Sequence, residues 1–166
     1  MRELRTIAEA SIPRALEKAE RYRFLNEPAE AESICLDVLA ADPDNEAALI
    51  MLVLALSDQL DERPAAVFGR AKDVAAKIRD DYARAYFHAL LCERRAKAHQ
   101  KQKSPGSGGV AYEWYQQALE GYARALELRQ PGNEDAVLRW NTCVRALASD
   151  PSLKPAPIDS FTPLLE

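Results

Sequence analysis

The sequence predicts an all-helical protein, and three observations support this fold class. Strong helix formers (Ala, Leu, Glu and Arg) dominate the 166 residues. No stretch alternates apolar and polar residues over the length of a strand. Glycine is sparse outside one cluster, Gly106, Gly108 and Gly109. With 48% hydrophobic and 29% charged residues, a chain of this length can bury a sizeable core as a single domain.

Prolines mark the expected helix ends in the first third of the chain. Residues 1–11 are expected to form a short helix or a frayed lead-in. Pro13 suits a helix start, because its fixed φ and missing N–H cost nothing in the first turn, and this helix should end near Leu25. Pro28 opens a second helix, which ends before Asp42.

The middle of the chain is expected to form three helices. A helix begins near Glu46, a turn follows at residues 61–64, and a partner helix covers about residues 65–79. Another helix begins near Tyr82 and continues through Lys97.

The last third begins with a stretch, residues 104–109, whose Ser, Pro and Gly content is typical of a flexible insert. A helix is expected to resume near Ala111, and a final helix to cover about residues 134–147. Residues 152–166 of the tail contain three prolines, so this stretch cannot be a regular helix throughout.

The spacing of residues 12–45 is the most specific signal in the chain. Small residues stand at Ala19 and Ala31, an aromatic residue at Tyr22, and a proline closes the unit at Pro43. This pattern, at a period of about 34 residues, resembles the tetratricopeptide repeat. The second repeat departs from the pattern, because it is about two residues longer and has no closing proline.

The resemblance covers about residues 12–148, and it implies a right-handed superhelix of about three antiparallel helix pairs plus a C-terminal capping helix. The expected organisation is a lead-in at 1–11, repeats near 12–45, 46–81 and 82–133 with an insert at 104–109, a cap at 134–148 and a Pro-rich tail at 149–166.

In this family the first helices of the repeats line a concave face that holds a peptide or a partner protein. The resemblance transfers ten partner-binding positions: Leu16, Glu20, Arg23, Ile50, Met51, Leu54, Tyr86, Phe87, Leu90 and Arg94. The six apolar ones from the second and third repeats could form one continuous patch, and such patches mark interaction sites. The same stripe is also typical of core packing, because a register shift of one residue rotates the set by about 100°.

Some family members hold a C-terminal carboxylate with Lys and Asn side chains on the first two repeats. The matching positions here are Leu16, Glu20 and Met51, so the resemblance does not imply a ligand of that kind.

No motif predicts catalysis. The phosphate-binding pattern G-x-x-x-x-G-K-[ST] and the nucleophile pattern G-x-S-x-G are absent. His88 and Cys92 lie one helical turn apart, but two ligands do not make a zinc site. Cys35, Cys92 and Cys143 fall at apolar helical positions and are interpreted as small buried hydrophobes. We therefore expect no enzyme activity, no cofactor and no metal.

The net charge of −4 gives no general attraction to nucleic acid or to an anionic membrane. One basic run precedes the predicted insert: Arg94, Arg95, Lys97, Lys101 and Lys103. It could contact an acidic partner or RNA, or it could be a solvated extension of the helix. No apolar run is long enough to span a membrane, and no signal-peptide pattern follows Met1, so a cytoplasmic protein is expected.

The tail is rich in large apolar side chains: Leu153, Ile158, Phe161, Leu164 and Leu165. Either it packs on an apolar face of its own or a neighbouring chain, or it is a disordered terminus. The sequence as a whole predicts a non-enzymatic adaptor that binds a protein or peptide through its groove. The alternatives are a structural subunit whose groove and tail mediate self-assembly, and an RNA-binding accessory protein.

Overall fold

The computed structural model describes residues 2–61 and 64–157, and within these ranges every regular element is a helix. One 3-10 turn precedes seven α-helices: η1 (Glu9–Ser11), α1 (Ile12–Phe24), α2 (Pro28–Ala41), α3 (Glu46–Ser57), α4 (Pro64–Ala75), α5 (Asp81–Gln102), α6 (Ser107–Leu128) and α7 (Asp135–Ser149). The predicted all-helical fold class is confirmed for the described residues. None of these helices is both long and apolar enough to cross a membrane.

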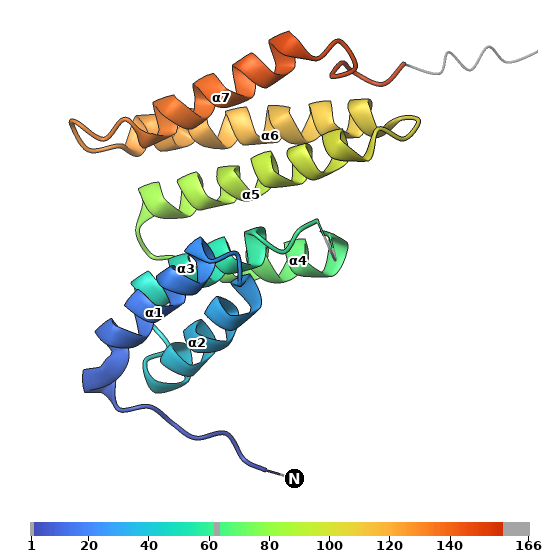
Figure 1. Cartoon of the computed structure of the whole chain (residues 1–166). Helices are drawn as coiled ribbons and strands as arrows, with labels where there is room; N and C mark the ends of the chain where they lie inside the picture. The colour runs from blue at the N-terminus through green and yellow to red at the C-terminus, as the bar shows by residue number, and fades with distance from the viewer. Residues whose placement is uncertain (1, 62–63, 158–166) are drawn as a thin grey trace, which may run out of the picture.

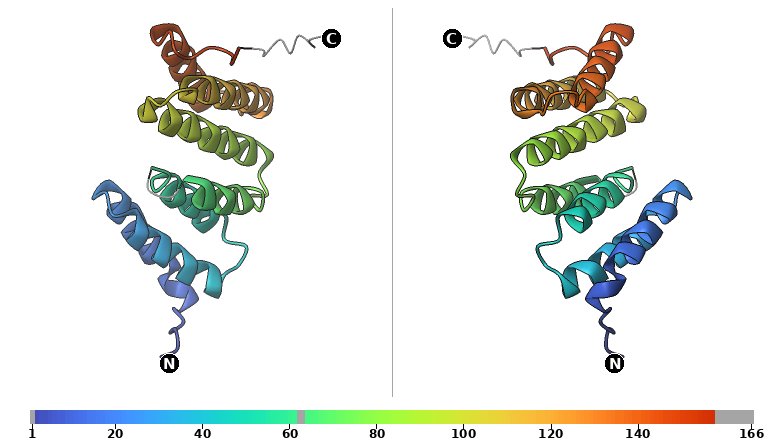
Figure 2. Two further views of the ribbon diagram at one scale, coloured as in Figure 1. Left: turned by 90° about the vertical axis from the view of Figure 1, so that its right-hand side faces the viewer. Right: turned by 90° about the vertical axis from the view of Figure 1, so that its left-hand side faces the viewer.

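The helices are stacked in chain order, with the N-terminal end and residue 157 at opposite ends of the stack (Figures 1 and 2). Each α-helix packs against the next one in the chain. The odd-numbered helices also contact one another, α1 with α3, α3 with α5 and α5 with α7. These four helices therefore share one face of the stack.

Two helix starts are fixed by side-chain caps. The side-chain oxygen of Asn45 accepts a hydrogen bond of 2.9 Å from the backbone N–H of Ala48, at the start of α3. Asp80 accepts one of 2.7 Å from the N–H of Ala83, at the start of α5. Each cap satisfies an amide that the first turn leaves without an acceptor, so these boundaries follow from local chemistry.

The beginning of α6 differs from the prediction. The helix starts at Ser107, inside the expected flexible insert at 104–109, and not near Ala111. The C-terminal segment explains the glycines there, because it packs against the first turn of α6. A Cβ atom at Gly108 would lie 2.4 Å from the carbonyl oxygen of Ser152. Gly108 therefore permits a close approach between two backbone segments, whereas composition alone predicts a flexible insert at this place.

The same C-terminal segment shows that part of the apolar tail packs on its own chain. Leu153 is only 6% exposed and belongs to the apolar cluster formed by α5, α6 and α7. Packing of the tail on its own chain is thus confirmed at Leu153. The other apolar tail residues, Ile158, Phe161, Leu164 and Leu165, lie outside the described residues.

Replacing Gly108 by alanine is expected to displace the segment 150–157 from α6, because the new methyl group cannot coexist with the carbonyl of Ser152. Amide hydrogen exchange in residues 150–157 should then become faster, and mass spectrometry would detect the change. Gly109→Ala is the matched control, since its Cβ would lie at an ordinary contact distance of 3.5 Å from Ala156. Equal exchange in the two variants would contradict this explanation of Gly108.

Two large apolar clusters fill the stack. The first is formed by residues of α1 to α5 and includes Cys35, and the second by residues of α5 to α7 and includes Cys92 and Cys143. All three cysteines are buried and free, as predicted. Burial raises the pKa of the Cys35 and Cys143 thiols to about 12 and that of Cys92 to about 11, so these thiols stay protonated and unreactive at neutral pH.

Candidate functional site

A cleft of about 490 Å³ opens on the face shared by the odd-numbered helices. Its walls come from the C-terminal ends of α1 and α3 with the turns that follow them, from the second half of α5 and from the first half of α7. The charged residues in its lining are Arg23, Asp58, Asp61, Arg94, Lys97, Lys101 and Arg139. Five cationic side chains and two carboxylates line the cleft, and the buried carboxylate of Glu93 pairs with two of those cations, which leaves two positive charges in excess.

Three of the cations come from a single helix. Arg94, Lys97 and Lys101 are spaced at i, i+3 and i+7, so they share one face of α5. Arg95, from the same basic run, points elsewhere, because its guanidinium carbon lies 5.6 Å from the centre of the Phe68 ring of α4. The helix thus divides the basic run between the cleft and the opposite side of α5.

One carboxylate ties three helices together at the cleft. Asp58, the residue that follows α3, accepts a 2.7 Å hydrogen bond from Nε of Arg23 on α1 and another of 2.7 Å from Nη1 of Arg94 on α5. A guanidinium carries five N–H donors, and each arginine uses only one of them on Asp58. Both arginines are therefore held in place with donors left over for an anionic ligand.

A second carboxylate, that of Glu93, binds two further cations of the cleft lining. Glu93 is fully buried and accepts hydrogen bonds from Nζ of Lys97 at 2.6 Å, from Nε of Arg139 at 3.0 Å and from the hydroxyl of Tyr122 at 2.7 Å. A second hydrogen bond joins Nη2 of Arg139 to Glu93. Burial by itself would raise the pKa of Glu93, but the hydrogen bonds from Arg139, Lys97 and Tyr122 outweigh it and lower the pKa.

The structure places some of the predicted partner-binding residues in the cleft and others against the apolar interior. Arg23 and Arg94 line the cleft, and Glu20 is exposed on α1. The apolar residues mostly pack inward. Leu16, Ile50, Met51, Leu54, Tyr86 and Phe87 are partly buried, and all but Leu54 pack against the apolar clusters.

The prediction that Leu90 contacts a partner needs correction. This side chain is only 6% exposed, so little of its surface could contact a partner. The reason lies in α5, whose residues 89–93 are all buried. A helix covered by neighbours on all sides has no apolar stripe facing solvent, so the pattern of its sequence does not separate core from groove. None of the six apolar groove candidates is among the large hydrophobic side chains that the structure exposes.

The sequence prediction of the groove omitted Lys97, Lys101 and Arg139. The signal for the two lysines was present, since they follow Arg94 at helical spacing. Arg139 had no comparable signal, because its place in the cleft depends on how α7 crosses α5.

The predicted absence of a zinc site concerns His88 and Cys92, which lie one turn apart on α5. His88 and Cys92 do meet, with 4.0 Å between Nδ1 and Sγ. Among residues 2–61 and 64–157, however, no group of three or more His, Cys, Asp or Glu side chains is placed to hold a metal ion. Burial and the nearby Lys72 lower the pKa of His88, so its imidazole is neutral at pH 7.

Comparisons with known proteins give no relative from which a role could be transferred: no family model, no curated protein and no solved structure matches this chain. The cleft has to be interpreted from its own chemistry.

Proposed function

We propose that this chain is a non-enzymatic scaffold of the tetratricopeptide type, which binds an acidic segment of a partner protein in the cleft on its odd-numbered helices. The observation that carries the proposal is the excess of cations in that cleft, together with the spare donors of Arg23 and Arg94. Arginine forks suit carboxylates because they can donate two parallel hydrogen bonds.

The arrangement of the cleft reduces the cost of binding. Asp58 and Glu93 hold four of the five cations in fixed positions, so little side-chain entropy is lost when an anionic segment arrives. The cleft is also too open and too basic to favour a small apolar ligand. Recognition would rest on charge pairing, because Met51 and Phe87 are partly buried and are not among the residues that line the cleft.

Selection from a random peptide library displayed on phage would test this proposal. Peptides selected on the wild-type protein are expected to be rich in Asp and Glu. Their affinity, measured by fluorescence anisotropy, should fall about tenfold or more in the double variant Arg94→Gln/Lys101→Gln, because two cations of the cleft are lost.

The matched control is Arg124→Gln/Arg129→Gln, which removes the same charge from exposed positions outside the cleft. It should bind the selected peptides like the wild type. If the two double variants lose the same affinity, the effect is one of net charge, and the cleft is not the site. Circular dichroism would verify that both variants are folded.

The same cations favour one other class of ligand, RNA, since a basic groove can follow a phosphate backbone. A fluorescent single-stranded RNA of mixed sequence distinguishes the two. RNA binding that falls steeply with salt and is lost in Arg94→Gln/Lys101→Gln would support the RNA-binding function.

A further inference from the structure

Phe24, the last residue of α1, is an aromatic side chain that the helical stack leaves uncovered. It is 79% exposed. Seven large hydrophobic side chains are exposed in the part of the chain that the structure describes, and Phe24 is the only aromatic one among them. It is also the only one of the seven that lines the basic cleft. The cleft therefore contains an apolar surface that charge pairing does not use.

The exposure of Phe24 follows from its position on α1. Ala19 and Tyr22 of the same helix pack in the apolar cluster of α1 to α5. Phe24 comes two residues after Tyr22, which places it about 200° further around the helix, away from that cluster. The ring thus fills no space in the core, and packing within the chain does not explain a large aromatic residue at this position.

The ring of Phe24 shares the cleft with guanidinium groups. Arg23 precedes it in the chain and lines the cleft together with Arg94. The other apolar residues of the lining are Pro28, which is partly buried, and Leu60, which is only 2% exposed. Phe24 is therefore the apolar residue of the cleft with the most surface available to a ligand.

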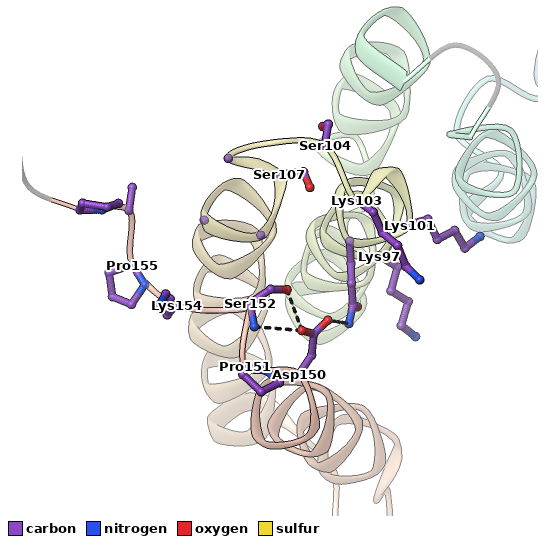
Figure 3. Close-up of a pocket in the computed structure, with 16 residues that line it drawn as sticks. Lys97, Lys101, Lys103, Ser104, Ser107, Asp150, Pro151, Ser152, Lys154 and Pro155 are labelled. Carbon is purple, nitrogen blue, oxygen red and sulfur yellow. Dashed lines mark hydrogen bonds between the residues drawn. The ribbon is translucent and has the colours of Figure 1, made fainter.

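Positive charge continues beyond the cleft along the C-terminal part of α5. Lys97 and Lys101 line the cleft and also a neighbouring cavity of about 1040 Å³, to which Lys103 contributes as well (Figure 3). The one carboxylate in the lining of that cavity, Asp150, already accepts hydrogen bonds from Gln100 and from its own neighbour in the chain. A bound segment with several carboxylates would thus meet cations over more than the length of the cleft.

The two kinds of surface require two kinds of ligand group. Carboxylates can pair with the arginines and lysines, but they do not cover an aromatic ring. Removing the exposed ring of Phe24 from water is favourable only if the ligand brings an apolar side chain against it. Aromatic and arginine side chains are also the ones that most often dominate the binding energy of protein interfaces. A segment made only of acidic residues would therefore use the charged part of the cleft alone.

We propose that the acidic segment bound by the cleft carries a large apolar residue next to its carboxylates, and that Phe24 recognises this residue. The inference rests on the proposed peptide-binding function and narrows the class of its ligand. The carboxylates pair with Arg23, Arg94 and the lysines of α5, and the apolar side chain packs on the ring of Phe24. Phe24 thus determines specificity, whereas the cations supply the attraction common to all acidic segments.

A pair of synthetic peptides labelled with fluorescein tests this inference on the full-length protein. The first is a short peptide of Asp and Glu residues with a single Phe at its centre, and the second has Ser in place of that Phe. Fluorescence anisotropy should show that the wild type binds the Phe peptide about tenfold more tightly, because an aromatic side chain is removed from water. In Phe24→Ala this difference should disappear, while the affinity for the Ser peptide stays unchanged.

The controls separate recognition by the ring from a general effect of surface hydrophobicity. Leu36→Ala removes another exposed apolar side chain, 47% exposed on α2 and outside the cleft, and it should keep the full difference between the peptides. Phe24→Leu should keep most of it, because leucine is also large and apolar. Since Phe24 is so exposed, Phe24→Ala should also have the melting temperature of the wild type, which circular dichroism would verify.

The failure of this inference differs from the failure of the proposed function. Equal affinity of the wild type for the two peptides, or an undiminished difference in Phe24→Ala, would overturn the role of Phe24. The peptide-binding function would still stand if Arg94→Gln/Lys101→Gln weakened the binding of both peptides. If that double variant bound both peptides like the wild type, or if neither peptide bound the wild type, the proposed function would fail and the inference with it.

Discussion

Glu93→Ala is expected to destabilise the protein by about 3–5 kcal/mol, the cost of breaking a buried ion pair by removing one partner. Arg139, Lys97 and the hydroxyl of Tyr122 all bond to this one carboxylate, which is fully buried between α5, α6 and α7. Its loss leaves the Tyr122 hydroxyl without an acceptor and two cations close together without a counter-charge. Urea unfolding followed by circular dichroism would measure the change.

Glu120→Ala is the control, because Glu120 is exposed on α6 and forms no ion pair with the described residues. Its effect should stay within about 0.5 kcal/mol. A loss below about 1 kcal/mol for Glu93→Ala would mean that the buried network does not hold α7 on the stack.

The pKa of Glu93 predicts how the free energy of unfolding depends on pH. Its pKa in the folded protein is lower than the ordinary value of 4.5, so the unfolded chain binds the proton more tightly. The stabilisation is complete above pH 4.5 and is lost as the pH falls through the folded-state pKa. Glu93→Gln should therefore show a weaker dependence of unfolding free energy on pH between neutral pH and pH 3 than the wild type.

Gly121→Ala is expected to destabilise the protein although alanine is the better helix former. A Cβ atom at Gly121 of α6 would lie 2.7 Å from Cβ and 3.2 Å from Cα of Ala89 on α5, so the two helices would have to separate. Overpacking of this kind costs about 1–3 kcal/mol, which exceeds the gain of roughly 1 kcal/mol in helix propensity. Gly121→Leu should cost more still, and thermal unfolding would rank the three proteins.

Gly69→Ala is the matched comparison, because its Cβ would meet nothing within 4 Å on the exposed side of α4. Here only the propensity term remains, so a stabilisation of about 0.5–1 kcal/mol is expected. A shift of the same sign in Gly69→Ala and Gly121→Ala would contradict the close approach of α5 and α6.

The helices were predictable where their signals are local. Pro28 opens α2, and Asn45 and Asp80 cap α3 and α5, so their positions could be predicted from neighbouring residues. The start of α6 could not, because Gly108 and Gly109 indicate a loop until the segment 150–157 is known to pack against them. That contact joins residues more than forty positions apart.

The candidate cleft shares only part of its lining with the partner-binding residues predicted from the sequence. Arg23 and Arg94 line the cleft, whereas Leu90 is buried and Met51 and Phe87 pack against the core. Apolar periodicity identifies the face of a helix that packs, and it cannot distinguish packing against a partner from packing within the chain. The superhelical repeat itself stays a prediction.

The two apolar clusters meet on one helix, and this affects how the chain should lose its structure. Leu91 of α5 belongs to the cluster of α1 to α5, while Ala89 and Cys92 of the same helix belong to that of α5 to α7. Either end of the stack can fray without exposing the other cluster, but neither cluster can stay intact once α5 melts. Slow amide exchange should therefore be concentrated in α5, with protection decreasing towards α1 and α7, and the cooperativity of unfolding is set by the one element that both halves share.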